Sequence, residues 1–181
     1  MDSNNHYEVA FASYLLAQRL CYVAVDESRR SLADETPIKS LDFIVFGQDG
    51  IRLVVDIKGR RFPGGPPSRP RRVWQCWSGR EDIDGLERWA SLAGPDYRAL
   101  LVFSYQLHSS VVLDPDTPDL FAFRGKRYLF RAVDVGDYRE HMRGLSPSWQ
   151  TVTLTRDTFR ALVRPMRDFL RPCAASSEVP F

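Results

Sequence analysis

The first sixty residues combine one stretch of helical periodicity with short, almost wholly apolar runs. From Asn5 to Leu20 the apolar residues recur three or four positions apart behind a capping-type asparagine, which predicts a helix. Glu8 lies at the head of its apolar stripe. Apolar runs over 21–25, 41–46 and 51–57 predict three strands.

The second and third of these strands should form a hairpin whose register can be argued. If residues 48–50 form a three-residue loop with the glycine in the left-handed conformation, pairing continues until Asp42 faces Asp56. Both carboxylates then share one face of the sheet. A loop one residue longer would pair Asp42 with Val55 and put the two acids on opposite faces. We predict the first register.

Beyond the hairpin, the pattern predicts a helix, a buried strand, a second hairpin and a last helix. Ser78-Gly79-Arg80-Glu81 is a capping-box pattern, and the helix that it opens ends at Gly94. The run 98–107 is apolar on both faces, as in a central strand, so helix and strand together indicate an α/β crossover. The remaining predicted elements are a hairpin of 120–124 and 127–135 around Gly125-Lys126, and a helix capped by Thr155 that runs through Phe159, Leu162 and Phe169 with a kink at Pro165.

Length and composition place these elements in one α/β domain. The 181 residues suffice for a single core, so we assign residues 1–171 to one domain and 172–181 to a frayed tail. No apolar run approaches the roughly 18 residues of a membrane span, and we expect no membrane partner. The first residues lack the pattern of an export signal and the three cysteines are scattered, which together predict a cytoplasmic protein with reduced thiols.

Charged residues follow the third strand in a pattern that indicates chemistry. Residues two apart on a strand point the same way, so the Asp56 carboxylate and the Lys58 ammonium emerge side by side. Taken alone, such a pair is more often an exposed ion pair worth at most about 1 kcal/mol. Glu8 alone is more often a charge that the helix dipole favours. Together with Asp42 across the hairpin, however, the set indicates a metal site.

A basic stretch follows directly and contains no acid between residues 57 and 79. It surrounds a Pro/Gly-rich segment, 62–68, that we expect to be a mobile loop. The arginines suit contact with a phosphate backbone, while a solvated loop is an equally weighted alternative. The candidate contact residues are Arg60, Arg61, Arg69, Arg71 and Arg72. Gln75, between Trp74 and Trp77, is a further candidate for the site, although such tryptophans are more often core.

The order of elements, with an acid on the first helix, Asp42 on one strand and Asp56-Ile57-Lys58 on the next, resembles the PD-(D/E)XK nuclease superfamily. The resemblance covers roughly the first 107 residues. Within it, His6-Tyr7-Glu8-Val9-Ala10-Phe11 looks like a little-characterised bacterial family with a His-Tyr-Glu-x-Ala-Phe-Glu signature, whose last glutamate is replaced here by Ala12. The implied fold is a restriction-endonuclease-like three-layer core of helix, mixed sheet and helix, with an added C-terminal hairpin and helix.

The resemblance implies a Mg²⁺-dependent nuclease, with Mn²⁺ as a substitute ion and DNA as the substrate. Glu8, Asp42 and Asp56 would bind the metal, and Lys58 would act on the attacking water, with Gln75 near the site. The chemistry is consistent, because clustered carboxylates attract a hard cation that activates water. Two alternatives stay open: a nucleic-acid-binding or assembly module without turnover, and an RNA substrate. Relatives with this fold also suggest a homodimer.

Overall fold

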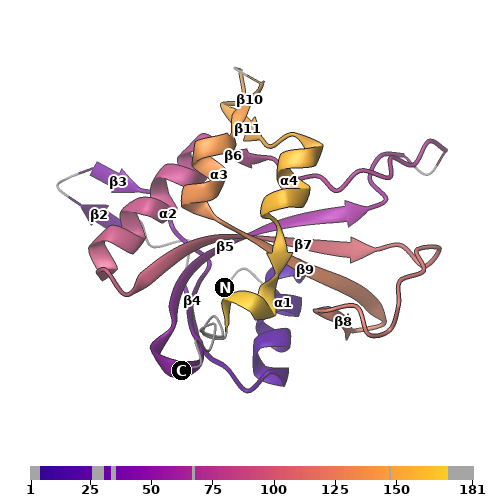
Figure 1. Ribbon diagram of the computed structural model, residues 1–181, viewed down its shortest axis with the longest axis horizontal. Helices are drawn as coiled ribbons and strands as arrows, with labels where there is room; N and C mark the ends of the chain where they lie inside the picture. The colour runs from indigo at the N-terminus through magenta and orange to yellow at the C-terminus, as the bar shows by residue number, and fades with distance from the viewer. Residues whose placement is uncertain (1–4, 26–30, 34–35, 67, 147, 171–181) are drawn as a thin grey trace, which may run out of the picture.

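The computed structural model describes residues 5–25, 31–33, 36–66, 68–146 and 148–170, and is drawn in Figure 1. A first helix is followed by a run of strands, and three further helices are interspersed with the remaining strands. The helices are α1 (His6–Ala17), α2 (Arg80–Ala93), α3 (Val135–His141) and α4 (Arg156–Leu162), with short 3₁₀ turns η1 (Gln48–Gly50) and η2 (Met166–Phe169). The strands are β1 (Cys21–Ala24), β2 (Ser31–Ala33), β3 (Thr36–Ile38), β4 (Phe43–Phe46), β5 (Arg52–Phe62), β6 (Ser78–Gly79), β7 (Tyr97–Leu107), β8 (Leu120–Phe123), β9 (Lys126–Asp134), β10 (Arg143–Ser146), β11 (Thr151–Thr153) and β12 (Arg164–Pro165).

A mixed sheet forms the centre of the fold. Among the described residues its strands follow the order β1-β4-β5-β7-β9-β12, and β8 pairs with the first part of β9, from Lys126 to Leu129. β5 and β7 run parallel along their whole length because α2 carries the chain back between them, whereas the other pairs are antiparallel. A small sheet, β10-β11-β6, lies beside the start of α2. The predicted crossover and the central position of the 98–107 strand are confirmed.

Helices cover both faces of this sheet and create two apolar layers (Figure 1). On one face α1 buries Phe11 and Leu15 against Val55. On the other face α2 buries Ile83 and Leu86 against the sheet, and α3 and α4 extend that layer. Each large apolar side chain buried here contributes about 1.5–3 kcal/mol. This arrangement of helix, mixed sheet and helix, with the added β8–β9 hairpin and α4, confirms the predicted fold class.

The predicted register of the first hairpin is confirmed. Phe43 pairs with Val55 and Phe46 with Arg52, and the Gly47 N–H donates to the Ile51 carbonyl at 2.8 Å. Gly50 has φ +83°, the left-handed value that a glycine accepts without strain. The pairing does not extend to the predicted Asp42–Asp56 pair, because the Asp42 N–H donates to the Val55 carbonyl at 3.0 Å. The β4 strand begins only at Phe43, so Asp42 lies just before the ladder that was predicted to contain it.

Several predicted boundaries were wrong by a few residues. α1 begins after Asn5, whose side chain accepts from the Tyr7 N–H, and ends at Ala17 rather than 20 because Arg19 adopts a left-handed φ of 57°. β5 does not stop at residue 57 but continues to Phe62, so the predicted loop is shorter by that residue. The helix cap at α2 is Gly79, with Asp82 in place of Glu81 as the reciprocal acid.

The C-terminal predictions also needed correction. The turn between β8 and β9 is Arg124-Gly125, not Gly125-Lys126, because both of its residues have positive φ. α4 ends at Leu162 instead of kinking at Pro165, since proline restricts the residue before it to extended conformations. α3 was not predicted at all. The predicted tail, 172–181, lies outside the described residues.

Candidate active site

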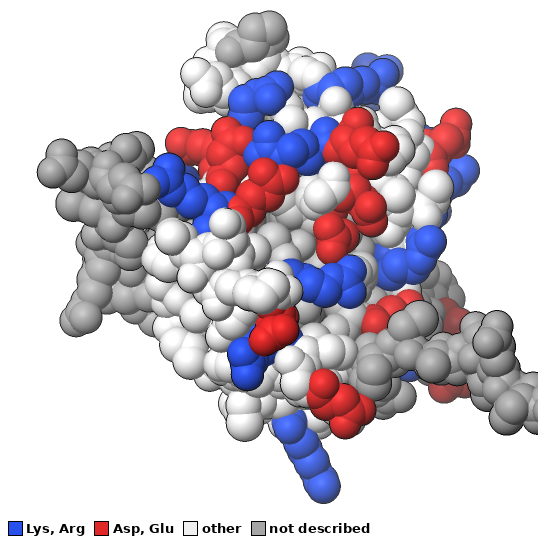
Figure 2. Space-filling model, turned by 60° about the vertical axis from the view of Figure 1, so that its left-hand side comes forward, with Lys and Arg blue, Asp and Glu red and all other residues white. Residues whose placement is uncertain are grey.

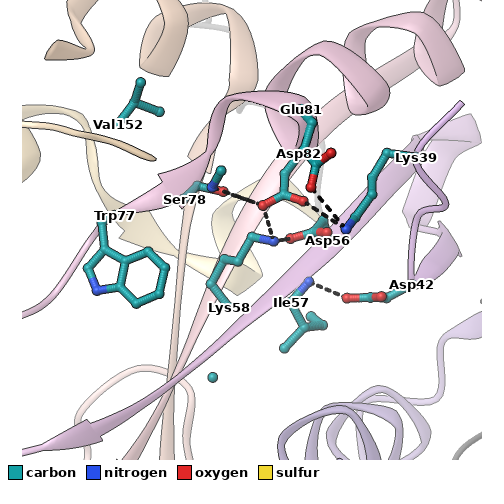
Figure 3. Close-up of polar contacts among 12 residues, drawn as sticks. Lys39, Asp42, Asp56, Ile57, Lys58, Trp77, Ser78, Glu81, Asp82 and Val152 are labelled. Carbon is teal, nitrogen blue, oxygen red and sulfur yellow. Dashed lines mark hydrogen bonds and ion pairs between the residues drawn. The ribbon is translucent and has the colours of Figure 1, made fainter. Parts of the chain in front are cut away.

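Lys58 lies between two buried carboxylates. Its Nζ is 2.6 Å from Asp56 Oδ2 on the same strand and 2.6 Å from Asp82 Oδ2 on α2 (Figure 3). The side chain of Lys58 is 16% exposed, and those of Asp56 and Asp82 are 7% and 9% exposed. The pairing of Asp56 with Lys58 follows from strand alternation, which sends both side chains toward α2. The ammonium therefore joins the central strand to the helix that covers it.

Asp82 is fixed by the start of α2. Its Oδ2 accepts from the Ser78 hydroxyl at 3.1 Å and from the Gly79 N–H at 3.0 Å. These are the two residues of β6, which pairs with β11 through Val152. The first turn of a helix also presents unpaired N–H groups that favour an anion. The carboxylate is consequently held in place by contacts that do not involve Lys58.

Asp42 lies where β4 separates from β5. Its N–H donates to the Val55 carbonyl at 3.0 Å, and its Oδ2 accepts from the Ile57 N–H at 2.6 Å (Figure 3). The carboxylate thereby takes the place of the main-chain partner that β4 no longer supplies to Ile57. Asp42 is 6% exposed. Its carboxylate thus lies one peptide unit from Asp56, at the edge of the same strand.

The pKa values of Asp56, Asp82 and Lys58 are shifted in different directions. Burial raises the pKa of Asp56, and the negative charge of Asp82 adds to the rise, while Lys58 opposes it. Burial also disfavours the charged form of Asp82, but Lys58 and the Gly79 N–H outweigh it and lower that pKa. Burial disfavours the ammonium of Lys58, yet the two carboxylates raise its pKa. Asp82 is therefore the better compensated of the two anions.

Asp56 has a single close partner at one oxygen. Its buried Oδ2 lies 2.6 Å from Lys58 Nζ, and no other described residue supplies a donor to it. A buried carboxylate is costly unless a cation or hydrogen-bond donors compensate its charge. Asp42 and Asp56 both offer hard oxygen ligands, so this pair fits Mg²⁺, which needs one or two carboxylates and keeps several waters. The described residues include no group of three or more His, Cys, Asp or Glu side chains spaced to hold an ion.

Among the described residues Glu8 does not form a three-ligand group with Asp42 and Asp56. Glu8 lies in the first turn of α1 and accepts from the Asn5 side-chain amide. α1 packs on the face of the sheet that carries Val55 and Ile57, whereas the Asp56 side chain points to the other face. The sheet therefore separates the helix that bears Glu8 from the Lys58 ion pairs. The face on which α1 packs was not readable from periodicity.

Gln75 and the exposed arginines lie farther along. The Gln75 carbonyl accepts from the Tyr105 hydroxyl at 2.9 Å, and its side-chain amide lies beside Gly64, past the end of β5. Arg61 contacts the Tyr7 hydroxyl on the α1 face. The main chain of Arg71 pairs with Gly64 across the predicted loop, and its side chain is exposed. Arg69 and Arg72 are exposed as well.

Arg60 has a different environment from the other four arginines. Its guanidinium stacks on the Trp77 indole at 3.9 Å and donates to the carbonyls of Trp77 and Gly59. The residue is 9% exposed, and burial lowers its pKa. A guanidinium engaged in this way cannot also reach a phosphate backbone. We therefore remove Arg60 from the set of candidate nucleic-acid contacts.

Asp82 is the site residue that the sequence analysis missed. In the sequence it is an acid in the first turn of a predicted helix, and nothing in the spacing of Asp82 and Lys58 indicates that they meet. The available signal was the acidic first turn of the helix that follows a strand ending in Asp-x-Lys. The α/β crossover returns such a helix across the same strand, so its N-terminus lies near the strand's charged residues.

Comparisons with known proteins show little similarity in sequence. Neither a protein-family model nor a curated protein sequence matches the chain. Among solved structures, the chain is similar to Hjc, a Holliday junction resolvase from the archaeal hyperthermophile Archaeoglobus fulgidus, at 9% identity. The superposition covers 88% of this chain and 93% of that one, with a TM-score of 0.48. In the described residues no helix is long and apolar enough to cross a membrane.

Proposed function

We propose that the protein is a divalent-metal-dependent nuclease that hydrolyses DNA phosphodiester bonds. The observation that carries the proposal is the position of Lys58 beside the buried Asp56, with Asp42 one peptide unit away. Aspartates on adjacent strands with a neighbouring lysine supply both a place for a hard cation and a positive charge for a phosphate.

In this proposal Asp42 and Asp56 hold Mg²⁺ or Mn²⁺. The ion, when bound, polarises the scissile phosphate and lowers the pKa of a water molecule. Lys58 presents its ammonium to the reacting phosphate or the attacking water and neutralises developing charge. A lysine suits this role because its charge is compact and its three donors can reorient. Glu8 and Gln75 are left outside the proposed machinery because of their positions.

Nucleic acid would be held by the exposed arginines in the last part of β5 and beyond it, namely Arg61, Arg69, Arg71 and Arg72. On the face where α2 lies, Lys and Arg are interspersed with Asp and Glu (Figure 2). There Arg139 pairs with Asp84 and Glu87, which neutralises it. DNA rather than RNA, a homodimer and a cytoplasmic location remain predictions.

The test is cleavage of labelled single-stranded, duplex and branched DNA in Mg²⁺ or Mn²⁺, with RNA as a competitor. We expect wild type to cut at least one DNA form, and Asp56→Asn and Lys58→Met to lower the rate at least about a hundredfold. Asp84→Asn is the matched control, because Asp84 is an exposed carboxylate on α2 paired with Arg139. Cleavage by Asp56→Asn at the wild-type rate would refute the proposal.

The alternative is a nucleic-acid-binding module that has the fold without turnover. It is favoured by one observation: Lys58 already neutralises Asp56 and Asp82, and three-ligand groups are absent from the described residues. Calorimetry with Mn²⁺ separates the two functions. A nuclease should bind Mn²⁺ in a manner that Asp42→Asn abolishes, whereas the module should bind DNA equally with or without the ion.

A further inference from the structure

We propose that Lys58 keeps its ion pair with Asp82 when a divalent cation binds Asp56. Asp82, in the first turn of α2, would thereby raise the affinity of the site for the metal. The inference rests on the proposed function, because it requires Asp56 to be a metal ligand. It assigns to Asp82 a positioning role, since it acts on the site through Lys58 and contacts neither ion nor substrate.

The geometry provides two equivalent partners for one ammonium. Lys58 Nζ is 2.6 Å from an oxygen of each aspartate, so giving up Asp56 requires no movement of the strand. Asp82 cannot follow the lysine, because the Ser78 hydroxyl and the Gly79 N–H hold the same oxygen. One partner is thus a fixed anchor, and the other has Lys58 as the single close partner of its oxygen.

Electrostatics then predicts which carboxylate Lys58 keeps as its partner when a cation binds. A divalent cation at Asp56 repels the neighbouring ammonium and takes over its compensating role. With Asp82 present, Lys58 keeps a full carboxylate partner. With Asp82 removed, the described ion pair that remains to Lys58 is the one with Asp56, so the ion must displace it without compensation. Lys39 lies on the other side, 3.8 Å from Asp82 Oδ1 and 3.4 Å from Glu81, and adds positive charge at a greater distance.

Metal affinity is the first measurement. We expect Asp82→Asn to weaken Mn²⁺ binding about tenfold or more by calorimetry, the range typical of lost supporting contacts. Glu81→Gln is the matched control: Glu81 is the preceding residue, its side chain is 72% exposed, and it pairs with Lys39. This control should change the affinity less than about twofold. Equal Mn²⁺ affinities of wild type and Asp82→Asn would overturn the inference.

The same substitution made in a Lys58→Gln protein shows whether Asp82 acts through Lys58 or only by its own negative charge. If Asp82 acts through the lysine, Asp82→Asn should have little effect on Mn²⁺ affinity in a Lys58→Gln protein. If it acts only as a nearby negative charge, the loss should be at least as large there, because no ammonium screens the carboxylate. A loss of the same size in both backgrounds would therefore overturn the inference.

The lysine itself can be observed without any catalytic assay. The chain has three lysines, so ¹⁵N labelling gives ammonium signals that substitution at Lys39 and Lys126 can assign. In wild type, we expect Lys58 to give a signal protected from exchange that shifts on addition of Mg²⁺ but persists. In Asp82→Asn the same addition should release the ammonium and abolish the signal. Persistence of the signal in Asp82→Asn with Mg²⁺ bound would contradict the proposed exchange.

If Asp82→Asn fails to fold, Ser78→Ala provides the test, because it keeps the charge and removes one of the contacts that fix it. It should weaken Mn²⁺ binding in the same direction by a smaller factor, and an unchanged affinity would count against the inference. Failure of the proposed function is distinguishable. It would appear as absence of Mn²⁺ binding by wild type, which overturns both, whereas normal wild-type binding with no effect of Asp82 overturns this inference alone.

Discussion

The two faces of β5 differ sharply over a span of five residues. Toward α1 the strand presents Val55, Ile57 and Gly59, which lie beneath apolar and aromatic side chains. Toward α2 it presents Asp56 and Lys58. Neighbouring positions of one strand thus serve packing on one side and charge on the other. The apolar face fixes the strand rigidly, and this rigidity lets buried charges on the other face meet at defined distances.

A second difference exists within the charged face itself. Lys58 is surrounded by carboxylates, whereas Arg60, the next residue on that face, stacks on Trp77 and donates to main-chain carbonyls. Both are buried cations with their charge engaged inside the protein. Only the arrangement around Lys58, however, includes an anion that a metal could take over. Burial of a cation therefore does not by itself indicate a site.

Substitution of Gly59 should disrupt the packing of α1 on the apolar face of β5 and destabilise the protein. A Cβ at Gly59 would overlap the ring of Tyr7, so Gly59→Ala should lower the free energy of unfolding by about 3 kcal/mol. Gly144→Ala is the control, because nothing lies within 4 Å of the added methyl, and it should change stability by less than about 0.5 kcal/mol. Urea denaturation measures both. Equal stabilities would mean that α1 is not packed on Gly59 as described.

Substitution of a buried and of an exposed arginine should have different consequences for DNA binding and for stability. Arg71→Ala should weaken DNA binding and reduce the dependence of log K on log salt by about one unit, because one phosphate contact is lost. Arg60→Met should leave the salt dependence unchanged and lower stability by about 1–3 kcal/mol through the lost stacking and hydrogen bonds. Filter binding at several salt concentrations and thermal unfolding separate the two. A reduced salt slope for Arg60→Met would restore that arginine to the interface.

The ion pairs of Asp82 and Asp56 should make the free energy of unfolding depend on pH, with a smaller effect than the substitutions above. The pKa of Asp82 is lowered in the fold, so its ionised form contributes stability above the unfolded value of about 3.9, and this contribution is lost as pH falls through the lower folded value. Wild type should therefore lose on the order of 1 kcal/mol more than Asp82→Asn between pH 5 and 3. Asp56 acts in the opposite direction because its pKa is raised, so Asp56→Asn should lose more than wild type. Parallel curves for the three proteins would contradict the described ion pairs.

What could be foreseen from the sequence was mostly local. The hairpin register followed from a loop whose glycine must be left-handed, and the Asp56–Lys58 pair followed from strand alternation. Asp82 could not be assigned to Lys58, because their contact depends on where the crossover places α2. The position of Glu8 likewise depends on which face α1 covers. Pairings between elements distant in sequence are fixed by packing, which periodicity does not contain.

The pairing of β7 with β9 decides how the chain can be shortened. β9 pairs with β7 from Leu100 to Leu107, so the C-terminal third of the chain supplies a strand of the main sheet. A fragment cut after residue 107 would expose one side of a long, nearly wholly apolar strand to other molecules, which is the usual origin of edge-to-edge aggregation. A shortened version of the protein that is meant to fold should therefore retain residues through β9 and β12.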